Sequence, residues 1–347
     1  MTLMSTTKYI LSILLALTVA SGHAEPVYWT ADGQQRSFNL PDSESLKLVV
    51  PAEAVAVDLR SLPAGGEGFT LDASQANANC LYYVDANCQL AGLPQQNVVC
   101  NGVAEEVVLG DESDFYCPVG FTATDILLRV TPRRDDGQTG SASTPYYDTL
   151  VLPFDSDGFL PTAINAVVGQ PWVQAWVLSS FADGLLEFLS VEAGCLQAGV
   201  PYLVKYDADI AQAPILFYGQ DKYVSATAEA RVDADDVSFV GRTMAAVPGM
   251  NYFRLQRNDA PCFVLADGSV PIEAFRCIIE PNPSAEAFST NAVSLEIVFG
   301  DAMPSTLPVA CRQEPVDRAA VWSLAGQRRR GLQRGLNVVR GRKLLVK

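Results

Sequence analysis

Histidine is the residue type whose scarcity limits the chemistry of this chain most. The single histidine, His23, lies in an N-terminal segment that we expect to be removed, and histidine is the usual general base and zinc ligand near neutral pH. The sequence therefore predicts neither Ser-His-Asp nor Cys-His catalysis, and no histidine-ligated metal or haem. We expect no cofactor and no enzymatic activity. A carboxylate-dependent glycosidase, which needs no histidine, is the enzyme class that stays open.

Eight cysteines could form disulfides in an oxidising compartment. Cys80 with Cys88 and Cys100 with Cys117 are close enough in sequence to close short loops, each contributing about 2–4 kcal/mol if formed. The alternative is that these cysteines are small buried hydrophobic residues, because Cys80 and Cys100 fall on apolar strand positions. Both interpretations stay open. No CxxC pair occurs, so neither a zinc ribbon nor thioredoxin-like chemistry is predicted.

Two groups of neighbouring acids carry the ligand type that calcium prefers, namely Asp111, Glu112 and Asp114, and Asp233, Asp235 and Asp236. Neither group has the glycine and terminal glutamate of an EF-hand loop. We interpret both as solvated turns and predict no metal site.

Four aromatic residues could line a platform on which sugar rings stack: Trp172, Trp176, Tyr202 and Tyr206. The alternative is packing in the core, which we favour because Trp172 and Trp176 are four residues apart beside apolar neighbours.

Charge is distributed unevenly along the chain. The whole sequence has a formal net charge of −15, yet residues 312–347 hold ten Lys or Arg against two acids, while residues 25–311 hold 13 basic and 37 acidic residues. An acidic body repels phosphate backbones, because nucleic-acid binding depends on cations that displace counterions. We therefore expect no nucleic-acid partner.

The first 24 residues have the pattern of a cleavable signal peptide. Lys8 precedes an apolar run over residues 9–20, and small residues follow up to Ala24, after which we expect cleavage. The apolar run is shorter than the roughly 20 residues that a membrane-spanning helix needs. The sequence thus predicts an exported protein with no transmembrane helix in its mature chain.

Alternation of apolar and polar residues favours β-strands almost throughout. It is clearest in residues 46–60, where Val55, Val57 and Leu59 alternate with Ala56, Asp58 and Arg60. Further strands are expected at 80–84, 97–100, 106–109, 126–130, 149–154, 202–206, 215–218, 237–240, 252–256, 262–265, 275–279 and 293–299. Only residues 163–175 and 182–189 have even weak helical spacing. We predict an all-β protein of two β-sandwich-like domains plus a small C-terminal β tail.

Two breaks in the pattern suggest how the domains are divided. Residues 133–143 are polar and rich in glycine and serine, which is typical of a loop or linker. Residues 301–316 contain three prolines and precede the basic segment. We expect a signal peptide at 1–24, β domains at 25–135 and 144–301, a linker at 302–319 and a basic tail at 320–347. Within the tail, strands are expected at 321–324, 336–339 and 344–346.

Several motifs occur in a fixed order over roughly residues 55–301: NCLYYVDANC, NVVCNGVAEEVVLGDESDFYCPVGFTAT, DTLVLPFDSDG, AGVPYLVKY, IEAFRCIIE and AVSLEIVFGD. This order resembles the repeating signature of exported Bacteroidetes-type surface proteins. The resemblance implies an adhesin-like, non-catalytic region.

The C-terminal segment AVWSLAGQRRRGLQRGLNVVRGRKLLVK is similar to the short endings of the same proteins. Those endings resemble the last strands of the C-terminal sorting domains used in type IX secretion. The resemblance implies that the tail contacts the export or sorting machinery. The residues assigned to this role are Gly326, Arg328, Arg329, Arg330, Gly335, Gly341, Lys343 and Lys347.

These observations favour a secreted or cell-surface protein, associated with the outer membrane, that serves as a structural or binding protein. The expected partner is a glycan or a host or cell-surface protein. The alternatives are a glycan-binding module for polysaccharide capture and, from another class, the carboxylate-dependent glycosidase.

Overall fold

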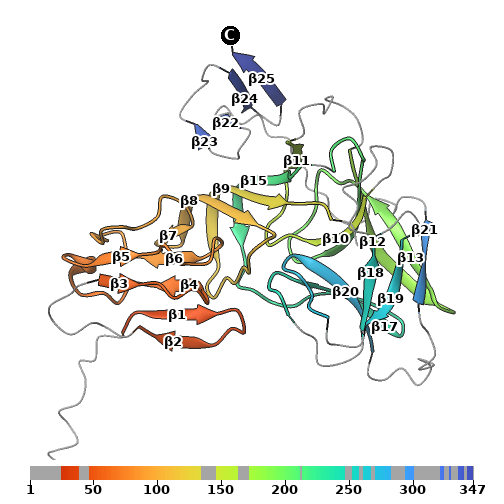
Figure 1. The fold of residues 1–347 in the computed structure, drawn as a ribbon, viewed down its shortest axis with the longest axis horizontal. Helices are drawn as coiled ribbons and strands as arrows, with labels where there is room; N and C mark the ends of the chain where they lie inside the picture. The colour runs from red at the N-terminus through yellow and green to blue at the C-terminus, as the bar shows by residue number, and fades with distance from the viewer. Residues whose placement is uncertain are drawn as a thin grey trace, which may run out of the picture.

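The computed structural model confirms the all-β class (Figure 1). It describes residues 25–38, 47–133, 146–162, 172–211, 213–246, 252–257, 261–266, 270–282 and 294–300, and the backbone of 321–323, 328–329, 335–339 and 342–346. In this part of the chain the one helical element is a single 3₁₀ turn, η1 (Pro63–Gly66). No helix among the described residues is long and apolar enough to cross a membrane. The expected signal peptide at 1–24 and the linker at 302–319 lie outside the described residues.

The first of two large sheets has nine strands, with parallel and antiparallel neighbours. In spatial order they are β11 (Gly158–Pro161), β15 (Ile215–Val224), β9 (Phe121–Val130), β8 (Val103–Gly110), β7 (Val98–Cys100), β6 (Leu81–Val84), β4 (Ala54–Asp58), β1 (Val27–Thr30) and β2 (Gln35–Ser37). We call it the first sheet. β4, β6 and β7 are parallel, as are β8 and β9, and the other neighbours are antiparallel.

The first sheet draws strands from both sides of the polar segment at 133–143. β15 pairs antiparallel with β9 along its length, from Ile215 opposite Val130 to Val224 opposite Phe121. β11 then pairs with the other edge of β15. The segments expected to form separate domains therefore share one sheet.

A small parallel pair, β3 (Lys47–Val49) and β5 (Thr70–Asp72), covers one face of the first sheet. Leu48 and Leu71 from this pair share a buried cluster with Val57 of β4 and Tyr82 of β6. The neighbouring strand residues Ala56 and Leu81 point the other way, into a second core. Both faces of β4 and β6 are thus buried, which explains their continuous apolar sequence.

The second large sheet has ten strands. In spatial order they are β10 (Tyr146–Val151), β14 (Pro201–Tyr206), β12 (Val173–Ala182), β13 (Leu185–Val191), β21 (Ser294–Gly300), β19 (Cys262–Ala266), β18 (Tyr252–Gln256), β20 (Arg276–Pro281), β17 (Val237–Arg242) and β16 (Ala230–Ala234). We call it the second sheet.

The second sheet folds back on itself, so that its two halves form the layers of a β-sandwich. Phe188 of β13 packs edge-on against Phe239 of β17, with ring centroids 5.5 Å apart. Across the layers, the Thr149 hydroxyl of β10 accepts a hydrogen bond from the Cys277 backbone N–H of β20 at 2.8 Å. Each fully buried phenylalanine contributes about 1.5–3 kcal/mol by leaving water. The expected β-sandwich-like architecture is therefore present.

β10 and β14 form a middle layer between the first sheet and the far half of the sandwich. Leu150 and Val204 point into the core shared with the first sheet, which also contains Phe217. Val151 and Leu203, one residue away, point into the sandwich core. Successive side chains of a strand face opposite sides, so these strands need apolar residues at nearly every position.

The weak helical spacing at 182–189 was misleading, because this segment belongs to a β-hairpin of β12 and β13. Its turn is Asp183-Gly184, and both residues have positive φ, 52° and 81°. An Asp-Gly pair between strands is a strong hairpin signal, since both positions of a type I′ turn need positive φ. Residues 163–171 lie outside the described part.

The C-terminal segment forms a separate four-stranded antiparallel sheet of β22 (Val321–Ser323), β23 (Arg328–Arg329), β24 (Gly335–Val339) and β25 (Arg342–Val346). Three of these strands coincide with those expected, and β23 is additional. Of the residues assigned to sorting, Arg328, Arg329, Gly335 and Lys343 fall in strands, whereas Gly326, Arg330, Gly341 and Lys347 lie outside the described residues.

Candidate functional site: a cleft where the two sheets meet

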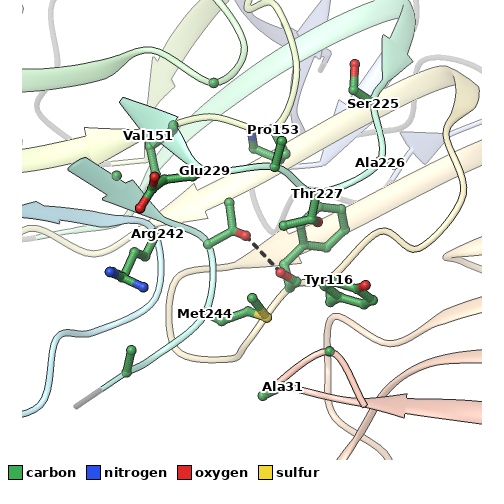
Figure 2. Close-up of a pocket in the computed structure, with 18 of the residues that line it drawn as sticks. Ala31, Tyr116, Val151, Pro153, Ser225, Ala226, Thr227, Glu229, Arg242 and Met244 are labelled. Carbon is green, nitrogen blue, oxygen red and sulfur yellow. Dashed lines mark hydrogen bonds between the residues drawn. The ribbon is translucent and has the colours of Figure 1, made fainter. Parts of the chain in front are cut away.

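An open cavity of about 850 Å³ lies where the first sheet meets β10 and β17 (Figure 2). Its lining comes chiefly from residues 31–33, 115–116, 151–153, 225–230 and 241–246. We call it the junction cleft. Small-molecule sites commonly occupy about 300–1,000 Å³ and lie at junctions between packed units. The junction cleft therefore has the size and the position of a binding site.

Residues 114–117, which follow β8, form the side of the cleft that belongs to the first sheet. Phe115 and Cys117 are buried in the core, whereas Tyr116 between them is only partly buried and lines the cleft. The ring of Tyr116 lies against Gly33 of the β1–β2 turn, where a Cβ would be 3.7 Å from the tyrosine hydroxyl. Alternation of an extended chain thus anchors this segment on one face and presents a phenol on the other.

Five hydrogen bonds join this segment to residues 227, 243 and 245. The Phe115 N–H donates to the Thr243 carbonyl and the Thr243 hydroxyl donates to the Phe115 carbonyl, both at 2.9 Å. The Thr227 N–H donates to the Cys117 carbonyl and the Cys117 N–H donates to the Thr227 hydroxyl, both at 2.8 Å. In addition, the Ala245 N–H donates to the Asp114 carboxylate at 2.6 Å. These bonds fix the width of the cleft.

Close packing shapes the floor, which Val151, Leu152 and Pro153 provide at the end of β10. Gly241 of β17 lies directly over this strand, and a Cβ at position 241 would be 2.8 Å from the Val151 Cβ. The absence of a side chain at residue 241 therefore lets the two strands approach and leaves the cleft open.

The segment from Ser225 to Glu229 runs along one side of the cleft, with Met244 and Ala31 opposite (Figure 2). It connects β15 of the first sheet to β16 of the second, and none of its residues has positive φ. Ala226 and Ala228 are exposed. Their backbone N–H groups donate no hydrogen bond to any described residue. One edge of this segment is therefore bonded through Thr227, and the backbone groups of Ala226 and Ala228 on its other edge have no partner in the described part of the chain.

The cleft carries three charged side chains, Asp32, Glu229 and Arg242. Hydrogen bonds from the Thr30 hydroxyl and the Gln34 N–H hold the pKa of Asp32 below its usual value. Arg242 is neutralised by Glu280, with 3.1 Å between Nη2 and Oε1. Glu229 also has a cationic partner, since its Oε2 lies 3.7 Å from Arg231 Nη1. Asp32 is ionised at neutral pH and makes no ion pair with a described residue, so it gives the cleft its acidic balance. A glycosidase needs one carboxyl group with a raised pKa, and Asp32 does not supply it.

A buried charge network lies at the same junction. The Arg276 Nη2 is 2.6 Å from Asp111 Oδ2, and its Nε is 3.3 Å from Asp148 Oδ2, with all three side chains at most 3% exposed. Arg257 also contacts Asp148 at 3.0 Å. Burial alone would lower the pKa of Arg276, but Asp148 and Asp111 raise it above its ordinary value. The guanidinium stays charged and links β8, β10 and β20 across the two sheets.

Of the two interpretations of the cysteines, the disulfides Cys80–Cys88 and Cys100–Cys117 are wrong, because Cys80, Cys88, Cys100 and Cys117 are all free thiols. Cys117 lies in the core between the sheets, whereas Cys100 packs on the opposite face of the first sheet, so these two cannot meet. Burial raises the pKa of Cys80 to about 12 and that of Cys117 to about 11. The alternative interpretation, of cysteines as small buried hydrophobic residues, describes Cys80 and Cys117.

The aromatic residues do not form a common platform. Trp172, Tyr202 and Tyr206 are buried in the core between the sheets, as the core-packing interpretation expected. Trp176 points to the other side of β12 and contacts Phe299 of β21, with ring centroids 4.9 Å apart. Trp172 precedes β12, which begins at Val173, so the two-residue period of the strand does not relate its direction to that of Trp176.

The acidic groups also separate in the fold. Asp111 is a buried partner of Arg276 and Asp114 binds the Ala245 N–H, while Asp233 accepts bonds from Arg231 and Ser238. No cluster of three potential metal ligands occurs among the described residues.

Sequence reasoning missed the junction cleft. Its walls are built from short runs of Ala, Ser, Thr and Gly, which carry no catalytic or ligand motif. The available signal was the exposed run SATAE at 225–229, too polar for a strand interior and too short for a domain linker. Searches against protein-family models, curated protein sequences and solved structures find no match to this chain.

Proposed function

We propose that this protein is an exported binding protein, secreted or presented at the cell surface, and that the junction cleft is its ligand site. The observation that carries the proposal is the cleft itself, about 850 Å³ in volume, with an apolar floor and a few polar groups at its sides. Binding sites typically combine apolar surface, which supplies affinity, with few polar groups, which supply orientation. Hydrogen bonds from both sheets hold these walls in place before any ligand arrives, and such preorganisation reduces the entropic cost of binding.

A filling substitution tests the cleft. Ala226 is exposed and lines the cavity, so Ala226→Trp should block the site without disturbing the core. Ala86, exposed in the turn after β6, provides the matched control Ala86→Trp. Screening the full chain against a glycan array and a peptide library should yield a saturable ligand that Ala226→Trp loses and Ala86→Trp retains. Finding none, or only ligands that both variants bind equally, would contradict the proposal.

The proposal that the protein is exported is based on the expected signal peptide at 1–24 and on the basic tail at 320–347. It is tested separately from the cleft. We expect intact-mass measurement of protein from fractionated cells to give a mature chain that starts at Glu25. Deleting residues 320–347 should leave the body folded and change its destination. Mature protein that starts before His23, or a truncated chain that reaches the same place in the same amount, would count against export by this route.

Glycan binding is the second candidate, favoured by an aromatic group at one end of the sandwich. Phe299, which is 42% exposed, lies between Trp176 and Tyr147, with ring centroids 4.9 and 6.2 Å away. Lys205 lies 5.6 Å from the centre of the Tyr147 ring. Aromatic faces can stack on sugar rings, so this aromatic group supports glycan binding as the second candidate. A glycan whose binding Trp176→Ala abolishes and Ala226→Trp spares would favour this candidate over the cleft.

A further inference from the structure

We propose that the junction cleft binds an extended, positively charged polypeptide segment, which pairs as an added β-strand with the backbone of residues 225–229. This inference rests on the proposed function and specifies the class of ligand.

The backbone groups of residues 225–229 are the reason to expect a polypeptide as the ligand. In an extended chain, alternate residues direct their N–H and C=O groups to opposite sides. Thr227 uses its N–H toward Cys117, so Ala226 and Ala228 direct theirs to the other side. Both alanines are exposed residues, and their backbone groups make no hydrogen bond to a described residue. A row of alternating donors and acceptors at strand spacing is matched by the backbone of another extended peptide.

Side chains along this edge leave room for a partner strand. Residues 226 and 228 are alanines, whose methyl groups do not shield the backbone, and no proline interrupts the segment. Exposed strand edges are usually protected by lysine, proline or a bulge. The segment from 225 to 229 lacks these features, although it lies beside an open cavity.

The cavity next to this edge can receive the side chains of the bound segment. Alternate side chains of an added strand would point toward Val151, Pro153 and Met244, which line the cleft. Asp32 and Glu229 stand at its sides. Arg242 is paired with Glu280 at 3.1 Å and Glu229 with Arg231 at 3.7 Å, whereas Asp32 makes no ion pair with a described residue and leaves a negative charge at the lining. Complementary charge steers association and penalises the wrong partner. Lysine or arginine side chains alternating with apolar ones therefore fit the cleft, and acidic ones do not.

The probe for this proposal is the acetylated and amidated peptide Lys-Val-Lys-Val-Lys-Val, titrated against the full mature chain by calorimetry. Two matched peptides accompany it, one with glutamate in place of lysine and one with alternate backbone amides methylated. We expect the methylated peptide to bind at least about tenfold more weakly, because each lost backbone bond removes roughly a kcal/mol or more. The glutamate peptide should bind more weakly still, by a margin that shrinks as salt screens the charges.

A pair of protein variants tests the same contact from the other side. Ala228→Pro removes the backbone N–H and Ala228→Ser keeps it. We expect the lysine peptide to bind Ala228→Pro about tenfold more weakly and Ala228→Ser within about twofold of the unmodified protein. Thermal unfolding of both variants shows whether the proline has disturbed the fold. The methylated peptide needs no variant, so the test survives even if Ala228→Pro unfolds.

No saturable binding of the lysine peptide, equal binding of the methylated peptide, or equal affinity of a folded Ala228→Pro and Ala228→Ser would each overturn the proposal. A glycan that binds the cleft and is lost in Ala226→Trp, with no peptide binding, would reject the polypeptide ligand and leave the proposed function standing.

Discussion

Two regions at the same junction treat polar groups in opposite ways. Around Arg276, three buried charges face one another with almost no exposed surface. At the junction cleft, by contrast, the backbone groups of Ala226 and Ala228 have no partner among the described residues. Buried polar groups must be satisfied within the fold, because leaving them unpaired is costly. Exposed groups are satisfied by water, and they stay available to a ligand.

Two arginines at paired positions show the same contrast in burial. Arg276 of β20 is directly opposite Arg242 of β17. The side chain of Arg276 is 3% exposed, whereas that of Arg242 is 34% exposed. The same residue type therefore stabilises the junction at one position and lines the cleft at the other.

Replacing Arg276 should have the largest effect. Arg276→Met leaves Asp111 and Asp148 buried without their main counter-charge, which should cost about 3–5 kcal/mol of unfolding free energy. The matched variant Arg242→Met should cost less than about 1 kcal/mol, because exposed ion pairs contribute little. Urea denaturation measures both. Equal losses would mean that burial does not distinguish the two arginines.

Replacing Thr227 should cause the second-largest loss of stability. Thr227→Val removes the hydroxyl that accepts from the Cys117 N–H at 2.8 Å. Because Cys117 is buried, its N–H would be left unsatisfied at a cost of about 1–3 kcal/mol. Thr124 of β9 has a hydroxyl with no hydrogen bond to a described residue, so Thr124→Val is the control. A control that loses as much stability as Thr227→Val would show that strand context, not the bond, sets the cost.

Acid should weaken the junction moderately through Glu273. Burial would raise the pKa of Glu273, but Arg257, Arg133 and Arg276 outweigh it and hold the pKa below its usual value. The contribution is therefore complete above pH about 4.5, the ordinary pKa, and is lost as the pH falls through the lowered folded value. We expect at most about 1 kcal/mol, since Glu273 is partly exposed and screened. Glu273→Gln should flatten the loss between pH 6 and pH 3, and an unchanged slope would refute this assignment.

A substitution in the junction cleft should have the smallest effect on stability. Ala226→Trp should change the unfolding free energy by less than about 0.5 kcal/mol, because the position is exposed and makes no core contact. A larger loss in urea denaturation would mean that residues 225–229 support the junction, as Arg276 does.

Local patterns predicted most of the strands. The alternation at residues 55–59 corresponds to β4, and the apolar runs at 149–154 and 202–206 correspond to β10 and β14. The Asp-Gly pair at 183–184 is a hairpin signal in the sequence, and it outweighs the weak helical spacing at 182–189. Pairing across the chain was not predictable, because β15 begins at Ile215 and β9 ends at Val130, so the 84 residues 131–214 intervene. No local pattern records such a partner.

By itself, the sequence determined the all-β class, the faces of the strands and the scarcity of histidine, because these depend on residue type and a period of two. Only the tertiary structure decided which acids would be buried. Asp111 meets Arg276 across 165 positions, while Asp114, three residues later, binds the Ala245 N–H in an exposed setting. Burial depends on which strands come together, and the cleft exists because two sheets meet at residues whose small side chains cannot fill the space between them.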